Sequence, residues 1–202
     1  MLKLLFPLPN KIVVALSGGV DSVAITDFLS QKHSVTCAFF HHGTENSERA
    51  FEFVDKFSAD RSLPLMIGMI KNNKPKELSM EEHWRNERYD FLDNIGDSLG
   101  PIITGHHLDD CVETYLWSSM HGQSKVIPAK RNNVVRPFLT TRKSEFVNWC
   151  ERKSIDWCHD NSNDDTKYMR NYVRTHLLPH ALHINPGLKT VVKKIVENQQ
   201  NV

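Results

Sequence analysis

The chain has 202 residues, a mass of 23.3 kDa and 40% apolar residues, enough for one full domain with a hydrophobic core. Its net charge is only +1, but the charges are unevenly distributed, because an acidic N-terminal segment is followed by a basic C-terminal one. The first ten residues hold one lysine and a brief apolar run, and no apolar window of about 18 residues follows, so the sequence excludes a secretory signal and a membrane span and predicts a cytoplasmic protein.

The N-terminal part alternates between patterns typical of strands and of helices. A continuous apolar run over 12–16 predicts a parallel strand buried on both faces. Apolar residues at helical spacing predict a helix over 21–29, and a strand is predicted over 34–40. The next predicted pair is a helix over 47–61 and a strand over 63–70.

The alternation continues through the middle of the chain. Ser79 and Glu82 have the spacing of a capping box at the head of a helix that runs through 83–95. A fourth strand is predicted over 101–105 and a helix over 109–120. This order predicts an α/β fold, a Rossmann-like open parallel sheet with helices on both faces, in which ligands lie beyond the carboxyl ends of the strands.

The residue pattern of the sequence changes after Gly122. A polar, turn-prone stretch and a short apolar segment precede a helix predicted over 141–153. A later helical pattern over 167–179 is predicted to stop at Pro179, and the tail beyond it is helical again. The chain is therefore divided into a core over 1–122 and a basic, mostly helical extension of the same unit over 123–202.

The segment Ser17-Gly18-Gly19 ends the first strand and turns directly into a helix. Such a turn points backbone N–H groups and the positive end of a helix at one spot, and glycine lets an oxyanion approach the backbone. Neither a Walker loop ending nor a G-x-G-x-x-G pattern is present, which argues against a simple kinase-type or dinucleotide site. An acid such as Asp21 is compatible with this anion-binding turn if the anion is a triphosphate that binds together with Mg2+, because the carboxylate then coordinates the metal. The alternative is that Asp21 only caps the helix.

Six ordered motifs carry a resemblance to a known family. They are SGGVDS from Ser17, HHG from His41, WRNERY from Trp84, TGHHLDDCVET from Thr104, RPFL from Arg136 and DNSNDDTKYMRNYVRTHLLP from Asp160. In this order they resemble the tRNA(Ile)-lysidine synthetases of the PP-loop ATPase superfamily. The resemblance implies the PP-loop ATP pyrophosphatase fold and a ligase that uses ATP and Mg2+. Such a ligase adenylates the C2 oxygen of the wobble cytidine in an isoleucine tRNA with a CAU anticodon, and free lysine then displaces AMP to give lysidine.

The resemblance also implies the site residues of the core. The residues expected to bind ATP are Ser17, Gly18, Gly19, Val20, Asp21, Ser22, His41 and Gly105. The residues expected to act in catalysis are Asp21, Asp109, Asp110 and Arg85, and the expected Mg2+ ligands are Asp21 and Asp109.

The role of Glu113 is left open, and Arg88 is expected to form an ion pair. Glu113 lies one helical turn after Asp110, and these acids could bind Mg2+, accept protons or pair with the ammonium group of lysine. Glu113 could equally be an ordinary surface acid in a first helical turn. Arg88 is expected to pair with one of the nearby glutamates, which are Glu81, Glu82 and Glu87.

The C-terminal segment is expected to contact the tRNA. From His121 onward it holds 14 Lys and Arg residues against 7 Asp and Glu, whereas the rest of the chain holds 11 basic and 17 acidic residues. Arg170 and Arg174 are spaced so that both can face one stretch of phosphate backbone. The alternative is a solvated basic face. The expected tRNA contacts are Arg136, Arg142, Lys143, Lys167, Arg170, Asn171 and Arg174, with Tyr168 and Trp157 as stacking platforms or as packing residues.

Two other functions and one other site stay open. A PP-loop tRNA thiolase needs paired cysteines, and Cys111 and Cys158 form no such pair in the sequence. A noncatalytic, nucleotide-dependent RNA-binding protein would have little need for acids beside phosphate. The four histidines at predicted strand ends invite a zinc site, but their spacing favours hydrogen-bonded loop residues.

The length of the chain differs from that of many members of the resembled family. These members carry further C-terminal domains that grip the tRNA, so the resemblance implies a compact form without them. We expect either a narrow tRNA substrate or a homodimer that supplies more tRNA-binding surface.

Overall fold

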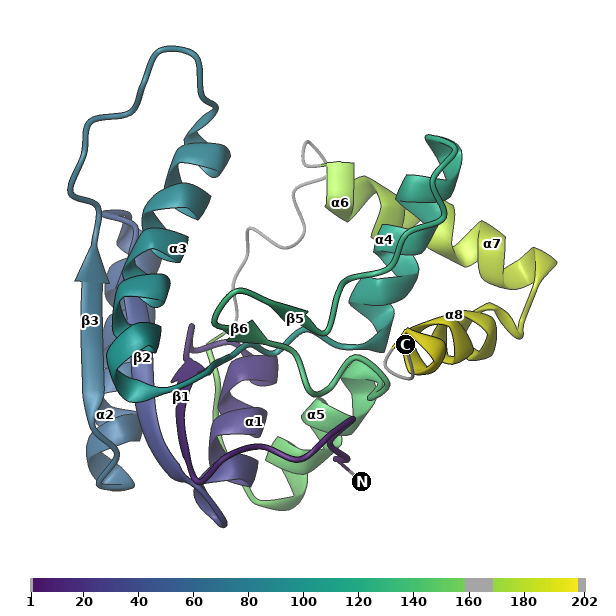
Figure 1. Ribbon diagram of the computed structural model, residues 1–202. Coiled ribbons are helices and arrows are strands. Elements are labelled where there is room, and N and C mark those ends of the chain that lie inside the picture. Colours follow the sequence, from purple (N-terminus) through teal and green to yellow (C-terminus); the bar gives the residue numbers. More distant parts are fainter. Residues whose placement is uncertain (1, 159–168, 200–202) are drawn as a thin grey trace.

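The computed structural model describes residues 2–158 and 169–199. Its centre is a six-stranded sheet in the order β3-β2-β1-β4-β6-β5 (Figure 1). All neighbouring strands are parallel except β5 and β6, which form an antiparallel pair at one edge. The predicted open parallel sheet is therefore confirmed, with one antiparallel edge strand that the sequence did not predict. The strands are β1 (Lys11–Ala15), β2 (Ser34–His41), β3 (Leu65–Met69), β4 (Ile102–Ile103), β5 (Lys130–Arg131) and β6 (Val134–Val135).

Helices cover both faces of the sheet, as predicted. Successive side chains of a strand point to opposite faces, so Ile12 and Val14 of β1 pack in one apolar cluster with α1, α2 and α5. Val13, between them, packs in another cluster with α3. Burial on both faces explains why the first strand is a continuous apolar run. These helices are α1 (Val20–Ser30), α2 (Glu45–Asp60), α3 (Met80–Leu99) and α5 (Lys143–Arg152).

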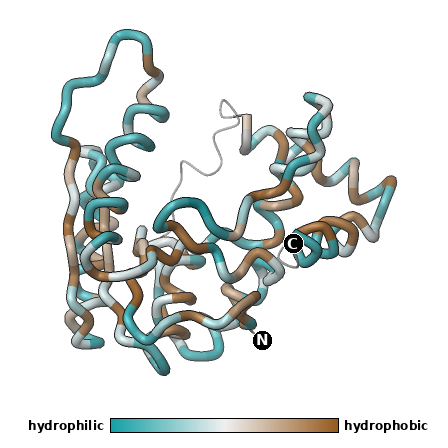
Figure 2. The backbone as a smooth tube through the Cα atoms, viewed as in Figure 1, coloured by the Kyte–Doolittle hydropathy of each residue, from teal (hydrophilic) through white to brown (hydrophobic). Residues whose placement is uncertain are grey.

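A further group of helices lies on the side of the molecule away from β3 (Figure 1). Leu108 and Val112 of α4 share an apolar cluster with Val192 and Val196 of α8. Hydrophobic and hydrophilic residues alternate along α8, as in a helix with one apolar face (Figure 2). The elements of this group are α4 (Leu108–Met120), α6 (Met169–Tyr172), the π-helical turn η2 (Val173–Leu177), α7 (Leu178–Ile184) and α8 (Leu188–Asn198).

The prediction that a helix stops at Pro179 is wrong. The chain stays helical through α7 to Ile184, and Pro179 lies in the first turn of α7. Proline has no N–H to donate and its ring clashes with a carbonyl one turn back, which normally breaks a helix. Here the wider turn η2 precedes it, with Leu178 N–H bonded to the Val173 carbonyl five residues back. Proline then occupies a helix start, where a missing N–H costs little.

Residues 130–152 of the predicted extension complete the sheet layer. β6 pairs with β4, and α5 packs against α1. Asp27 of α1 joins these layers, because its carboxylate accepts hydrogen bonds from Trp149 Nε1 at 3.0 Å and Lys153 Nζ at 2.7 Å. The division of the chain at residue 122 stays a prediction.

Candidate functional site

The loop between β1 and α1 is a compact turn held by serine hydroxyls. Gly18 has a φ of +86°, a left-handed conformation that favours glycine. Ser22 Oγ accepts a hydrogen bond from Ser17 N at 3.1 Å and donates one to the Gly19 carbonyl at 2.9 Å. Gly19 is the N-cap residue of α1, so the first N–H groups of the helix point out of this loop.

Two glycines leave room around this loop for different reasons. A Cβ atom at Gly19 would come no closer than 3.7 Å to another residue, so packing within the protein does not demand glycine there. The bare backbone instead leaves the helix start open to an anion. A Cβ atom at Gly105, beyond β4, would lie 3.3 Å from Asp21 Cβ, so Gly105 packs directly against the loop.

Asp21 lies in the first turn of α1 and does not act as its N-cap, which is Gly19. Its Oδ1 atom is buried and has no hydrogen-bond partner among the described residues. Its Oδ2 atom lies 3.7 Å from His107 Nε2. A buried carboxylate oxygen without a partner is costly, and a bound cation would satisfy it. The donor therefore fits the predicted Mg2+ site.

His107 stands at the centre of the acidic cluster, and the sequence analysis did not assign it a role. Its Nδ1 accepts from Asp110 N at 3.3 Å, and Asp110 Oδ2 accepts from His107 N at 2.9 Å, so the two residues cap α4 reciprocally. Burial disfavours its protonated form, but contact with Asp21 and the charges of Asp110 and Asp109 outweigh burial and raise the pKa of His107. Asp110 lies three positions after His107, the spacing of a capping box, although histidine is an unusual cap.

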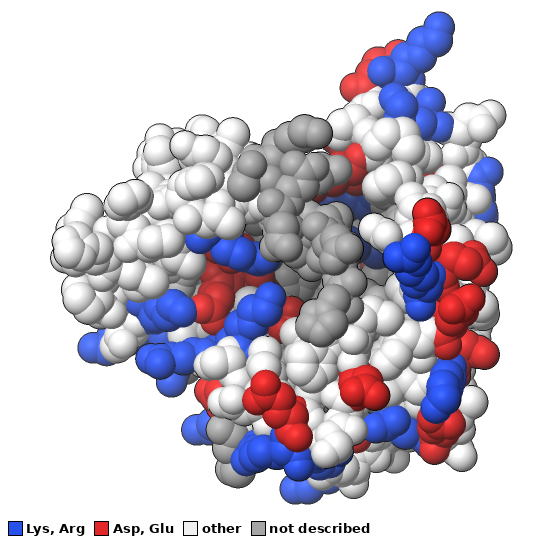
Figure 3. Space-filling view, turned by 180° about the vertical axis from the view of Figure 1, so that it is seen from behind, with Lys and Arg blue, Asp and Glu red and all other residues white. Residues whose placement is uncertain are grey.

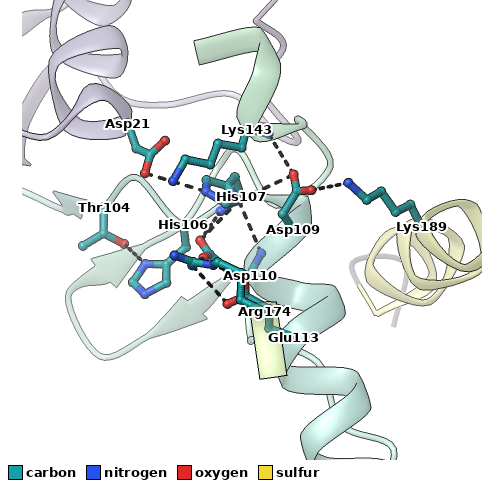
Figure 4. Close-up of polar contacts among 10 residues, drawn as sticks. All are labelled: Asp21, Thr104, His106, His107, Asp109, Asp110, Glu113, Lys143, Arg174 and Lys189. Carbon is teal, nitrogen blue, oxygen red and sulfur yellow. Dashed lines mark hydrogen bonds and ion pairs between the residues drawn. The ribbon is translucent and has the colours of Figure 1, made fainter. Parts of the chain in front are cut away.

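Asp109 is already paired within the protein. One oxygen accepts a hydrogen bond from Lys143 N at 2.8 Å, and the other contacts Lys189 Nζ of α8 (Figure 4). Burial opposes its ionisation, but these two partners lower the pKa of Asp109 below its ordinary value. Lys189 was not among the predicted site residues, because nothing in the sequence connects it with a residue 80 positions away.

Glu113 forms a bidentate pair with Arg174. Arg174 Nε donates to Glu113 Oε1 at 2.7 Å and Nη2 donates to Oε2 at 3.2 Å, and the same guanidinium lies 3.8 Å from Asp110 (Figure 4). Glu113 is only 3% exposed, so the interpretation as a surface acid is wrong. Arg174 tethers η2 to α4 in this structure, and its predicted contact with tRNA stays a prediction.

Arg85 and His41 lie outside this acidic cluster. His41 Nε2 lies 3.0 Å from Glu48 Oε2, and its Nδ1 accepts from Gly43 N. The Arg85 guanidinium lies 4.9 Å from the ring centre of Tyr89 on α3. Among the described residues, no hydrogen bond or ion pair joins Arg85 to the loop or to the acids of α4.

The predicted pairing of Arg88 with a glutamate is wrong. Glu87 accepts from Lys71 N and Asn72 Nδ2, and Glu81 and Glu82 are exposed. No carboxylate of the described residues lies within 4.0 Å of the Arg88 guanidinium, and burial lowers the pKa of Arg88.

The predicted tRNA contacts are not gathered on one face. Arg142 is exposed and Lys143 is half-buried, with a side chain that extends toward Asp21 (Figure 4). Arg136 is 3% exposed and donates to the Pro128 carbonyl at 2.9 Å, and Asn171 is buried, so both face the interior. Lys167 and Tyr168 lie outside the described residues, as does the side chain of Arg170.

The rear of the molecule shows where charge gathers. Acidic and basic side chains meet in a hollow beside the lobe that contains α7, whereas the lobe itself presents an almost uncharged surface (Figure 3). Within the described part of the chain, no group of three or more His, Cys, Asp or Glu residues is arranged to hold a metal ion by itself. No helix of that part is long and apolar enough to cross a membrane.

Comparisons with known proteins agree with this geometry. The chain is 31% identical to the bifunctional protein TilS/HprT of Listeria innocua, over 93% of the chain and 32% of that relative. It is 30% identical to the tRNA(Ile)-lysidine synthase of Thermosipho africanus, over 94% of the chain and 48% of the relative. The chain thus spans between a third and a half of the length of these curated relatives.

Solved structures support the fold. The U34-tRNA thiolase NcsA of Methanococcus maripaludis superposes with a TM-score of 0.75 at 15% identity, over 94% of this chain and 71% of that one. The NH3-dependent NAD synthetase of Campylobacter jejuni gives a TM-score of 0.56 at 15% identity, over 95% and 86%. At these identities the likeness concerns the fold alone. The family model of the PP-loop domain matches residues 3–181, and this chain therefore belongs to the PP-loop domain family.

Proposed function

We propose that the protein is an ATP-dependent tRNA-modifying ligase that joins lysine to C2 of the wobble cytidine in a CAU-anticodon isoleucine tRNA. The reaction would pass through an adenylated cytidine and would release pyrophosphate and then AMP. The similarity to tRNA(Ile)-lysidine synthases over most of the chain supports this proposal. The observation that carries it is the buried, unpartnered oxygen of Asp21 beside an open helix start.

The loop residues 17–22, with Gly105 packed behind them and His41 nearby, would bind the ATP substrate. The N–H groups at the start of α1 would hold phosphate oxygens, and the loop is already ordered by Ser22. Asp21 Oδ1 would take a Mg2+ ion, because no described residue forms a hydrogen bond with it. With Mg2+ bound, ATP supplies the adenylyl group and a stabilised pyrophosphate leaving group.

Asp109, also proposed as a Mg2+ ligand, would first need to release Lys189. Both of its oxygens have partners within the protein. Asp110 and Glu113 carry the negative charge that could attract the lysine substrate, and Arg174 neutralises part of it. Arg85 is proposed to face the reacting groups, although α3 holds it beside Tyr89 in this structure.

The tRNA would approach the side that carries Arg142 and Lys143, where cationic groups adjoin the acids. Lys167, Arg170 and Arg174 are proposed as further contacts. Arg136 and Asn171, both buried, would need a rearrangement to reach RNA. A homodimer is proposed as the source of additional tRNA surface.

Mass analysis of nucleosides from isoleucine tRNA tests the reaction. After incubation with the protein, ATP and lysine, we expect a cytidine heavier by one lysine less water. Asp21→Asn should lower the rate at least about a hundredfold, since it removes a charge that acts on the reacting phosphate. Asp55→Asn, which changes an exposed acid on α2, is the matched control. Lysidine formation by Asp21→Asn at the rate of the control would contradict the proposed role of the loop.

A sulfur-transferring function is less well supported. Burial raises the pKa of Cys37 to about 11, and burial with the nearby charges of Asp27 and Asp21 raises that of Cys150 to about 11, so neither is a ready thiolate. All four cysteines are free thiols. A product that gained sulfur instead of lysine would favour this alternative. An RNA-binding protein without catalysis would release no AMP in the same incubation.

A further inference from the structure

A small pocket separate from the acidic cluster lies between α3 and the β5–β6 hairpin. Its volume is about 150 Å3, and its walls include Arg85 and Tyr89 from the helix and Arg131 and Asn132 from the hairpin. The hairpin is fixed against α3 by the hydrogen bond from Asn133 Nδ2 to Asp97 Oδ1 at 2.6 Å. The pocket is therefore a built feature of the fold.

The residues that line this pocket carry more positive than negative charge, since two arginines, Arg85 and Arg131, stand against one acid, Asp93. Arg85 and Arg131 are exposed on opposite sides of it, and Arg88 and Arg136 lie behind, each in contact with Tyr89. No carboxylate of the described residues lies within 4.0 Å of any of these guanidinium groups. Arg136 is 3% exposed, and its Nε has no partner among the described residues. A cluster of guanidinium groups that no carboxylate of the described residues pairs directly favours an anionic ligand.

The pocket also offers an acceptor and an aromatic wall. Asp93 lines it, and the Oδ1 atom of Asp93 is buried without a hydrogen-bond partner among the described residues. The Tyr89 ring forms one wall. Buried polar atoms are nearly always hydrogen-bonded, so we expect a ligand in this pocket to donate a hydrogen bond to this oxygen. A ligand that fits must combine an anion, a flat ring and an N–H donor.

The volume of the pocket limits the size of the ligand that it can hold. Typical small-molecule pockets measure roughly 300–1,000 Å3, so a cavity of about 150 Å3 holds one planar group and not a whole nucleoside triphosphate. We propose that it receives an unpaired, amino-bearing base of the RNA substrate, with the base amino group donating to Asp93 and a flanking phosphate at Arg131. This inference rests on the proposed tRNA substrate.

The proposal predicts which bases fit. Cytosine, adenine and guanine carry an exocyclic amino group, and a carboxylate accepts from such a group. Uracil presents a carbonyl oxygen at the equivalent position, which Asp93 would repel. The base would stack on Tyr89, the usual way in which proteins hold unpaired RNA bases.

Binding measurements without ATP and lysine test this inference separately from the reaction. The probes are a labelled RNA stem-loop with a CAU loop, and CMP and UMP as competitors. Arg131→Ala, an exposed position, should weaken stem-loop binding about tenfold and reduce the salt slope by about one. Asp93→Asn should remove a preference for CMP over UMP of at least about fivefold. Arg49→Ala on α2, where the arginine pairs only with exposed Glu45, is the matched control.

Each outcome has one meaning. Arg131→Ala binding like the control, or equal binding of CMP and UMP by the wild type, overturns the proposal. Weaker CMP binding by the variants with stem-loop binding like that of the control would show that the pocket takes a free nucleotide and no RNA base, which also overturns the proposal. Base-selective RNA binding by a wild-type protein that never forms lysidine leaves this inference standing and removes the proposed function.

Discussion

Adjacent glycines in the β1–α1 loop serve two different purposes. Gly18 has a positive φ, so the fold itself requires glycine there, whereas Gly19 has an ordinary extended conformation and open space around it. The motif therefore contains one residue needed for folding and one needed for the ligand. Only the structure separates the two roles, because both positions look the same in the sequence.

Alanine substitutions separate these purposes. Gly18→Ala should lower the free energy of unfolding by about 1–2 kcal/mol, the cost of a left-handed conformation at a non-glycine residue. Gly19→Ala should cost less than about 1 kcal/mol but should weaken ATP binding, since the methyl group fills the anion seat. Urea denaturation and nucleotide titration measure the two effects. Equal losses of stability in both variants would contradict the assignment.

At the scale of elements, the Asp27 carboxylate joins three helices. It accepts hydrogen bonds from Trp149 of α5 and from Lys153, which caps the end of α5, and Arg61 at the end of α2 lies 3.5 Å away. Burial raises its pKa, but these partners outweigh burial and hold the pKa of Asp27 below its ordinary value of 3.8. The polar network fixes how α1 and α5 pack, beyond what their apolar contacts specify.

This network predicts a pH dependence of stability. Because the folded-state pKa of Asp27 is depressed, its contribution is present above pH 3.8 and is lost as the pH falls through the folded-state value. Asp27→Asn should cost about 1–3 kcal/mol at pH 7 and should flatten the stability curve below pH 4. Chemical denaturation from pH 2 to pH 7 checks this, with exposed Asp55→Asn as control. If the free energy of unfolding fell with decreasing pH equally steeply in the wild type and in Asp27→Asn, this role of Asp27 would be excluded.

Elements with strong local patterns could be predicted, and those defined by distant contacts could not. The strand β1 is a buried apolar run, and the helix α3 begins at Ser79, whose hydroxyl accepts from Glu82 N. The strand β5 is only Lys130–Arg131, polar residues that become a strand because β6 lies beside them. Pro179 misled the helix prediction because the preceding π-turn depends on packing.

At the scale of the whole molecule, charges separated along the sequence meet inside the fold. The acids of α4 obtain their cations from the C-terminal helices, Arg174 for Glu113 and Lys189 for Asp109. These pairs join residues 61 and 80 positions apart, so neither pair could be predicted from the sequence, in which Arg174 is expected to contact tRNA and Lys189 has no assigned role. The acidic cluster itself could be predicted, since parallel strands bring their carboxyl ends to one edge.

The pair of Glu113 and Arg174 predicts a non-additive double substitution. Arg174→Ala leaves the Glu113 carboxylate buried without its bidentate partner and should cost about 2–4 kcal/mol, less than for a fully buried pair because Arg174 is partly exposed. Adding Glu113→Gln should recover part of this loss, since it removes the uncompensated charge. Thermal and urea unfolding of the single and double variants measure the coupling. Strictly additive losses would show that the pair does not hold η2 to α4.

Lys189 offers a test of the site in the free protein. Lys189→Met should lower stability by about 1 kcal/mol and move the pKa of Asp109 back toward its ordinary value, because this lysine is one of the groups that lower it. The folded-state and unfolded-state pKa values of Asp109 then lie closer together, so the loss of stability as the pH falls below 3.8 should become smaller than in the wild type. Lys194→Met, an exposed lysine on the same helix, serves as control. Identical acid limbs in the two variants would count against the pairing.

The ammonium group of Lys189 on α8 already occupies the cation position beside Asp109, so a cation that binds there must exchange with it. If a divalent ion binds at Asp109 as proposed, it displaces the ammonium group of Lys189, a cation that is already in place. An exchange of this kind breaks one contact for each that it forms, so ionic strength should affect the affinity less than in a vacant acidic site. Until then, Lys189 offsets part of the repulsion among the carboxylates of α4 in the unliganded protein.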